Sequence, residues 1–163
     1  MKLKKFSWQI ALFMLLTFAT YSAYKSTRPV KIIDVHKDQN RRYLVVDNFP
    51  YTDHGKLNWW LSNKQYLEEN YGIPELHNDG IYSVVIWGIG DGYEIEERDR
   101  STFFPSRSTD HLFCFYDMKV EARCVRKENW KMGISAIPNN RISFSLGDSS
   151  YYQDQSGKII KSR

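Results

Sequence analysis

Residues 48–74, "NFPYTDHGKLNWWLSNKQYLEENYGIP", contain the clearest helix signal in the chain. Their apolar residues recur at helical spacing, and such a stripe packs a helix against a protein core. The residues of this stripe are Leu57, Trp60, Leu61, Leu67 and Tyr71. Thr52 or Asp53 can cap the first turn, and Gly72 followed by Pro74 provides a stop. The stretch therefore predicts one capped amphipathic helix.

Asp53 and His54, at the start of this helix, also form a candidate acid/base pair. A carboxylate at a helix N-terminus is stabilised by about 0.5 to 2 kcal/mol, which explains Asp53 without catalysis. A metal site at His54 would need further converging ligands, but His36, His77 and His111 lie on separate predicted elements. We therefore expect a surface role for His54, and no catalytic, metal or cofactor site is predicted.

The two adjacent tryptophans of the helix point in different directions. Trp60 belongs to the apolar stripe, whereas Trp59 is rotated by about 100° and aligns with Asn63 and Tyr66. Trp59 either packs beneath the loop at residues 99–110 or forms a partner-binding surface with Tyr66 and Asn63, because exposed aromatic side chains are typical binding anchors. The three residues are the candidate partner-binding site.

The remainder of the domain is dominated by short strand-like runs. Residues 30–36, "VKIIDVH", and 41–49, "RRYLVVDNF", are β-branched runs separated by a polar turn, so they predict a hairpin. Further runs are "IYSVVIWGI", "GYEIEE", "HLFCFYDM", "EARCVRK", "RISFSLG", "SYYQ" and "KIIK". The pattern predicts an α+β domain, in which a small, mostly antiparallel β-sheet carries one amphipathic helix.

Residues 88–93, "GIGDGY", resemble a phosphate-binding loop only superficially. Such loops continue into a helix and carry Gly-Lys-Ser/Thr or a third glycine at the dinucleotide spacing, and neither pattern is present. The next residues along the chain are strand-like and acidic. Asp91 and Gly92 therefore predict a hairpin turn with a positive φ angle.

Glu94 and Glu96 come directly after this turn and share one face of the predicted strand. Paired carboxylates can act as a general acid and a general base, so a small hydrolase is one interpretation. The other is a solvated edge of mixed charge, which discourages unwanted strand pairing.

Residues 6–24, "FSWQIALFMLLTFATYSAY", are an uncharged apolar segment. As a helix they span about 28 Å, close to the ~30 Å hydrocarbon core of a bilayer. The sequence thus predicts a single N-terminal transmembrane helix at 6–24, preceded by a cytoplasmic N-terminus at 1–5. A linker at 25–29 comes next, and then the soluble domain at 30–163.

A cleaved secretory signal is the alternative interpretation of this segment, with its apolar part at residues 10–19. Cleavage after Ala23 would place Tyr21 where a small side chain is needed, and cleavage after Ala19 would fall inside the apolar run. The cleavage rule therefore favours an uncleaved anchor.

The charge distribution excludes nucleic acid as a partner. The net charge is +4, yet the excess surrounds the apolar segment at Lys2, Lys4, Lys5, Lys25 and Arg28. Without these five, 18 of the 23 basic residues remain against 19 acidic ones, so no basic stripe is left to neutralise phosphates. The basic residues instead predict contact with a lipid bilayer. Lys2, Lys4 and Lys5 favour a cytoplasmic N-terminus and a periplasmic domain, although Lys25, Arg28 and Lys31 flank the other end of the segment.

Cys114 and Cys124, at the ends of "CFYDMKVEARC", can close a short hairpin. A disulfide here requires an oxidising compartment such as the periplasm. Two reduced, buried thiols are the alternative.

Several of these motifs resemble one family. "RPVKIIDVH", the 48–74 helix stretch, "GDGY", "CFYDMK" and Cys124 are similar to the enterobacterial inner-membrane proteins catalogued as domain of unknown function number nine hundred and forty-three. The resemblance extends from the anchor to about Cys124, and the Trp-Trp helix is its most specific part. It implies a short cytoplasmic start, a single span and a compact outer domain, without catalytic residues. A different basic residue can stand at His54 in this family.

Two function classes fit these observations. The first is a membrane-anchored binding protein of the inner membrane, either an immunity-type protein that neutralises a partner such as a toxin or an accessory of a membrane complex. The second is a small envelope hydrolase that uses Asp53 with His54, or Glu94 with Glu96. The lack of a converging catalytic set favours a binding protein over an enzyme.

Overall fold

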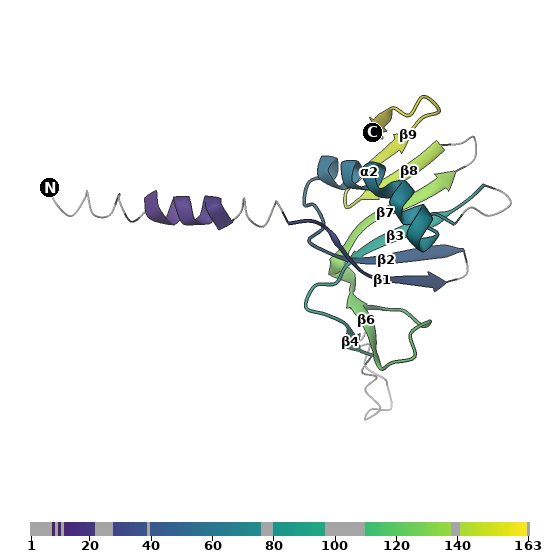
Figure 1. The fold of residues 1–163 in the computed structure, drawn as a ribbon, viewed down its shortest axis with the longest axis horizontal. Helices are drawn as coiled ribbons and strands as arrows, with labels where there is room; N and C mark the ends of the chain where they lie inside the picture. Colours follow the sequence, from purple (N-terminus) through teal and green to yellow (C-terminus); the bar gives the residue numbers. More distant parts are fainter. Residues whose placement is uncertain are drawn as a thin grey trace.

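The computed structural model describes residues 8, 10, 12–21, 28–38, 40–75, 80–96, 110–137 and 141–162. The domain is α+β and contains a seven-stranded sheet, a three-stranded sheet and one long helix (Figure 1). The main sheet has the spatial order β1 (Lys31–Asp38), β2 (Arg41–Asp47), β3 (Ser83–Gly88), β7 (Trp130–Ile137), β8 (Arg141–Leu146), β9 (Ser149–Gln153) and β10 (Ile159–Lys161). The small sheet has the order β4 (Glu94–Ile95), β6 (Ala122–Arg126) and β5 (Leu112–Cys114). The helices of the domain are α2 (Asp53–Tyr71) and the short 3₁₀ turn η1 (Lys127–Asn129).

The main sheet is antiparallel except for one pair. β1 and β2 form the expected hairpin, in which His36 lies opposite Tyr43. β2 and β3 run parallel, with Leu44 opposite Ile86, and α2 is the crossover between them. A parallel pair needs such a long connection, because a tight turn can only reverse the chain. The crossover places the C-terminal ends of both strands on the same edge of the sheet.

The helix α2 has the caps that the sequence predicts. Thr52 is the N-cap, and its hydroxyl accepts a hydrogen bond from the Gly55 N–H at 3.1 Å. Gly72 ends the helix in the left-handed conformation, with φ of 63°. Asp53 is the first helical residue rather than the cap.

The apolar stripe of α2 is narrower than the sequence predicts. Leu57, Trp60 and Leu67 are buried, but Leu61 is 40% exposed and Tyr71 is 39% exposed. Leu61 follows Trp60 by about 100° around the helix, so burial of Trp60 turns Leu61 toward the rim.

The main sheet has a hydrophobic core on each face. On β2, Leu44 and Val46 pack toward α2, whereas Tyr43 and Val45 pack toward the small sheet. Strand side chains alternate between faces, so a strand covered on both sides is apolar throughout. This explains the continuous run of buried residues in β2, whose register places every second side chain in each core.

The small sheet is built around the expected cysteine hairpin. β5 and β6 pair with Cys114 opposite Cys124, and a disulfide joins the two residues. The turn at Gly92 does have a positive φ, but it does not close a hairpin. β3 belongs to the main sheet and β4 to the small one, so the prediction of a hairpin here is wrong: β4 pairs with β6 instead.

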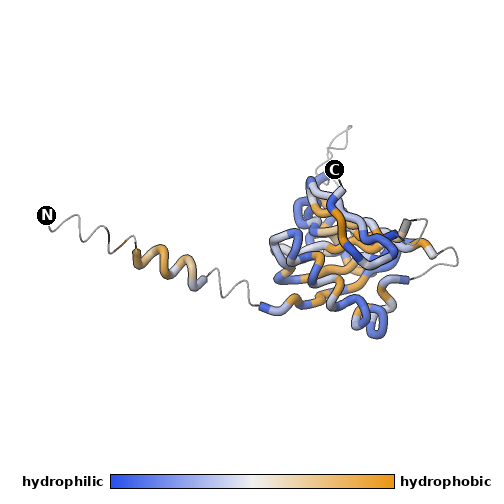
Figure 2. The backbone as a smooth tube through the Cα atoms, turned by 90° about the horizontal axis from the view of Figure 1, so that it is seen from above, coloured by the Kyte–Doolittle hydropathy of each residue, from blue (hydrophilic) through white to orange (hydrophobic). Residues whose placement is uncertain are grey.

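Residues 12–21 form an N-terminal helix that projects from the domain in both views (Figures 1 and 2). Its described side chains are exposed. Most of its residues are apolar, so much of the helix is orange in Figure 2, which colours the chain by hydropathy. Within the part of the chain that the structure describes, no helix is both long and apolar enough to cross a membrane. The predicted anchor at 6–24 is described only in part, and the predicted segment 1–5 lies outside the described residues.

Candidate functional site

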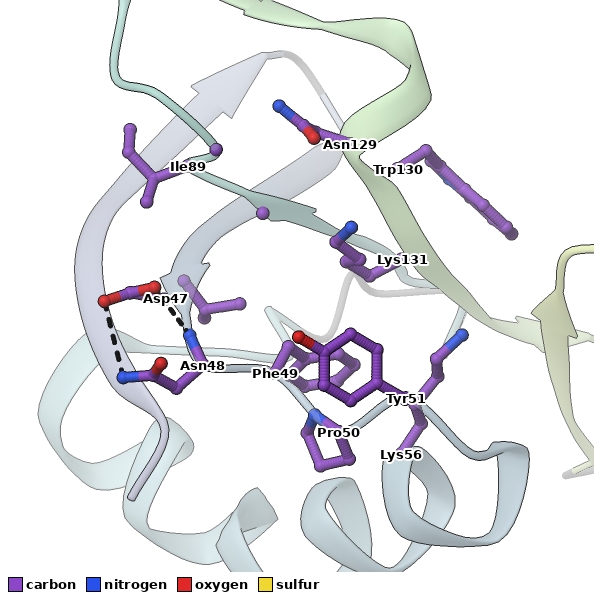
Figure 3. A pocket seen from close by; sticks show the side chains of 13 residues that line it. Asp47, Asn48, Phe49, Pro50, Tyr51, Lys56, Ile89, Asn129, Trp130 and Lys131 are labelled. Carbon is purple, nitrogen blue, oxygen red and sulfur yellow. Dashed lines mark hydrogen bonds between the residues drawn. The ribbon is translucent and has the colours of Figure 1, made fainter. Parts of the chain in front are cut away.

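A pocket of about 320 Å³ opens where β2 and β3 end beside the first turn of α2 (Figure 3). We call it the lysine pocket. Its lining residues are Val46, Asp47, Asn48, Phe49, Pro50, Tyr51, Lys56, Gly88, Ile89, Gly90, Asn129, Trp130 and Lys131. β2 and β3 run parallel and both end here, so the C-terminal ends of the two strands form part of the pocket wall.

Two lysines supply the positive charge of this pocket. Lys56 comes from the first turns of α2 and Lys131 from β7, and both are partly buried. Burial lowers the pKa of Lys131, and the nearby charge of Lys56 lowers it further, while Tyr51 and Glu128 act in the opposite direction. Among the described residues, no carboxylate forms an ion pair with either ammonium group. The pocket therefore holds two like charges that an anion would stabilise.

One carboxylate, that of Asp47, does line the pocket. Its oxygens accept hydrogen bonds from the backbone N–H of Asn48 at 2.8 Å and from the Asn48 side-chain amide at 3.4 Å. Figure 3 shows this carboxylate directed at Asn48, across the pocket from Lys131. Asp47 thus organises the backbone at the end of β2 and is not among the described carboxylates that form ion pairs.

Two glycines let the polar side chains lie close to the backbone. A Cβ atom on Gly88 would lie 2.6 Å from Cε of Lys131, so the lysine stem rests directly on this residue. A Cβ atom on Gly90 would lie 2.3 Å from Nδ2 of Asn129. Asn48 adopts a positive φ of 56°, and unfavourable backbone geometry of this kind clusters at binding sites.

A second pocket of about 430 Å³ adjoins the first and shares the segment 48–51 with it. Arg28 and Trp59 also line it. The Trp59 ring is partly buried and meets the Phe49 ring edge-on, with 5.1 Å between centroids. The loop expected to cover Trp59, residues 99–110, lies largely outside the described residues, so that prediction stays untested.

The other two candidate partner-binding residues line neither of these pockets. Tyr66 is 50% exposed, and its ring lies 6.1 Å from that of Tyr71. The Asn63 amide donates a hydrogen bond to the Trp59 carbonyl at 2.7 Å, within the helix. The role of these three side chains in partner binding stays a prediction.

Asp53 and His54 are engaged separately. The Tyr151 hydroxyl donates to the Asp53 carboxylate at 3.1 Å, which ties the start of α2 to β9. His54 is exposed, and its Nδ1 atom lies 2.9 Å from the Asn58 amide nitrogen one turn later. Each side chain therefore has a local structural partner.

Glu94 and Glu96 lie with the small sheet, on the opposite face of the main sheet from α2. Arg126 pairs with Glu94 at 2.6 Å, and Arg123 pairs with Glu96 at 3.1 Å. Each of the two carboxylates is therefore held in an ion pair with its own arginine.

A buried cluster around His36 is the feature that sequence reasoning missed. The ring is 3% exposed, stacks on Phe115 at 4.0 Å and has Nε2 2.9 Å from the Tyr93 hydroxyl. Its Nδ1 lies 3.2 Å from the Asp117 carboxylate. Burial, and then the charges of Asp34 and Asp117, raise the pKa of Tyr93. The cluster joins β1 to the small sheet.

One group of potential metal ligands also occurs in the small sheet. Single ligand atoms of Glu96, Cys114 and Cys124 lie within 4.8 Å of one another. The two sulfur atoms are joined in the disulfide, so neither is a thiolate that could bind a metal. The group is structural.

Comparison with known proteins identifies a family for this chain. The model of a family described as "Enterobacterial putative membrane protein (DUF943)" matches residues 2–163. The match confirms the resemblance seen in the sequence, and it includes the strands that come after Cys124. No curated protein and no solved structure matched the chain.

Proposed function

This chain belongs to that family of enterobacterial membrane proteins, and we propose that it is a membrane-anchored binding protein whose domain takes an anionic group into the lysine pocket. One observation carries the proposal. Lys56 and Lys131 share a cleft in which no described carboxylate pairs with either of them. Two partly desolvated cations attract an anion more strongly than exposed lysines do.

The proposed anchor is the apolar segment at residues 6–24, with the N-terminus in the cytoplasm and the domain in the periplasm. Its described side chains include Phe13 at 69%, Leu15 at 67% and Phe18 at 71% exposure. Lipid tails would remove this apolar surface from water. The Cys114–Cys124 disulfide supports an oxidising compartment for the domain.

Binding is a better account of the lysine pocket than catalysis. Lys56 and Lys131 offer charge, but no described nucleophile with an adjacent base lines the pocket. The hydrolase alternative relied on Asp53 with His54 or on Glu94 with Glu96. These side chains bond to other groups, and the two pairs lie on opposite faces of the main sheet.

A protein partner that docks on α2 is a second candidate, in the manner of an immunity-type or accessory protein. The observation that favours it is a group of exposed side chains on this helix, Leu61, Tyr66 and Tyr71. A photo-crosslinking residue at Tyr66 should then give one discrete adduct in envelopes, and one at the exposed Lys158 should not. Equal labelling from both positions would remove this candidate.

The pocket itself can be tested in the full chain. The protein is placed in phosphatidylcholine nanodiscs, its lysines are labelled by reductive ¹³C-methylation, and inorganic phosphate is added. We expect the resonances of Lys56 and Lys131 to move and the pKa of Lys131 to rise, because an anion stabilises the charged amine. Lys158 is the exposed control. If neither pocket resonance responds to phosphate, sulfate or an acidic peptide, the proposed function is wrong.

A further inference from the structure

The lysine pocket lies close to the end of the proposed anchor. Arg28 and Pro29 line the second pocket, and the anchor ends about four residues earlier, at position 24. Even a fully extended chain covers at most about 14 Å in four residues. The second pocket must therefore lie near the bilayer surface whenever residues 6–24 span the membrane.

The two pockets are continuous along one wall. Asn48, Phe49, Pro50 and Tyr51 line both of them, so the lysine pocket adjoins the pocket that Arg28 lines. Tyr51 is 75% exposed at this wall. Tyrosine is enriched at membrane interfaces, because its ring enters the apolar layer while its hydroxyl stays among headgroups.

The donors in the lysine pocket suit a phosphate group. Lysine binds phosphate as a point charge, and an ammonium group has three N–H donors for the oxygens of a tetrahedral anion. Asn129 adds an amide close to the Gly90 backbone. A phosphate has enough acceptor oxygens for the two ammonium groups and the Asn129 amide.

We infer that the lysine pocket binds the phosphate of an anionic phospholipid headgroup, which holds the domain against the membrane surface. The inference rests on the proposed function and names its ligand. A free phosphate ion offers the same chemistry, and so in part does an acidic peptide. The lipid is favoured because the shared wall of the two pockets leads back to Arg28 and the anchor.

The test compares sources of phosphate for the full chain carrying ¹³C-methylated lysines. One sample uses nanodiscs of phosphatidylcholine alone, a second adds phosphatidylglycerol, and a third keeps phosphatidylcholine and adds inorganic phosphate. We expect phosphatidylglycerol to move the resonances of Lys56 and Lys131 and to raise the pKa of Lys131 by about 1 unit. Lys31, which is exposed at the start of β1 next to the same linker, reports the general surface potential and should move less.

Variants provide an independent readout. Intact-protein mass spectrometry after transfer to neutral detergent should show about tenfold less retained phosphatidylglycerol for Lys56→Gln/Lys131→Gln, a loss of about 1.4 kcal/mol. Lys31→Gln/Lys158→Gln removes the same two charges from exposed positions, so it is the charge-matched control and should retain lipid as the wild type does. Thermal unfolding checks that each variant is folded.

The outcomes separate the two proposals. If inorganic phosphate or an acidic peptide moves the pocket resonances but phosphatidylglycerol does not, the lipid inference is overturned and the anion-binding function stands. If Lys31→Gln/Lys158→Gln loses as much lipid as Lys56→Gln/Lys131→Gln, retention reflects surface charge and the lipid inference is again overturned. If no anion moves the resonances, both proposals fail together.

Discussion

His36 shows how one side chain can join two sheets. Its ring stacks on Phe115 and lies within hydrogen-bonding distance of the Tyr93 hydroxyl, while Asp117 also meets the Lys37 backbone N–H at 3.1 Å. Asp117 lies 81 residues from His36 in sequence, and Tyr93 lies 57 residues away. Partners this far away along the chain form no local sequence motif, so the sequence alone does not reveal the cluster around His36. The predicted surface role of His54, by contrast, needed only its place in the first turn of the helix.

Removal of the Tyr82 hydroxyl should stabilise the domain. The side chain is 5% exposed, and its hydroxyl is buried without a partner among the described residues. Tyr82→Phe should therefore raise the free energy of unfolding at neutral pH by about 1 kcal/mol, because an unpaired buried hydroxyl costs desolvation. Urea unfolding measures this change. Tyr116→Phe, on a ring that is 67% exposed, is the control and should change little.

The same residue gives a prediction for alkaline pH. Burial, and then the charge of Glu68, raise the pKa of Tyr82 from 10.0 to about 12. The folded state therefore holds the proton more tightly than the unfolded state, so this stability is present below about pH 10 and is lost as pH rises from about 10 to about 12. Urea unfolding across this range should show a shallower loss for Tyr82→Phe than for the wild type. Equal slopes would contradict the prediction.

Gly90 links backbone conformation to the lysine pocket. Its φ is +58°, and an added Cβ would meet the Asn129 amide, so Gly90→Ala should displace Asn129 as well as strain the backbone. Gly147→Ala is a matched control, since its φ is +60° and nothing lies within 4 Å of its added Cβ. Both variants should lose about 1 to 2 kcal/mol of stability. Phosphate titration should show weaker binding for Gly90→Ala alone, and equal binding in both variants would contradict a role for Asn129.

Among the elements, α2 was the most predictable and β7 the least. The helix combines strong periodicity, a polar cap and a glycine stop within 20 or so residues, so its signal is local. In β7, Met132 and Ile134 are buried and alternate with Lys131, Gly133 and Ser135, but glycine and lysine weaken a strand signal. Because this strand was not predicted, Lys131, one of the two lysines of the pocket, was not identified as a candidate site residue either. The parallel pairing of β2 with β3 was also outside the reach of local patterns.

The N-cap of α2 should contribute measurable stability. Thr52 accepts the Gly55 N–H, and an alanine would leave that donor without its partner. Thr52→Ala should lower the free energy of unfolding by about 1 kcal/mol, and Thr52→Ser should restore most of it. Denaturant unfolding followed by circular dichroism measures both. If Thr52→Ala left the stability unchanged, the assigned cap would be contradicted. A cost of Asp53→Ala that disappears in a Tyr151→Phe background would instead come from the hydrogen bond to β9.

At the scale of the whole molecule, β2 and β3 form part of both hydrophobic cores and of the lysine pocket. One face of the two strands packs on α2 and the other packs on the small sheet, while their C-terminal ends line the lysine pocket. The pocket thus rests on a rigid centre that is buried on both sides. The small sheet depends on a different device, because it has few strands and is closed by the Cys114–Cys124 disulfide and the His36 cluster.

That disulfide provides a prediction about the orientation of the chain. A domain in the periplasm should carry Cys114 and Cys124 oxidised, so a maleimide that adds mass should label neither after cells are quenched with acid and the protein is denatured, unless a reductant is added first. In the purified protein, Cys114→Ser/Cys124→Ser should lower the free energy of unfolding by about 2 to 3 kcal/mol, since the bridge closes a short loop. Removing residues 1–24 is the control: the domain then stays in the cytoplasm, and both thiols should be labelled without reductant. Labelling of the full chain in untreated cells would place the domain in a reducing compartment and contradict the proposed orientation.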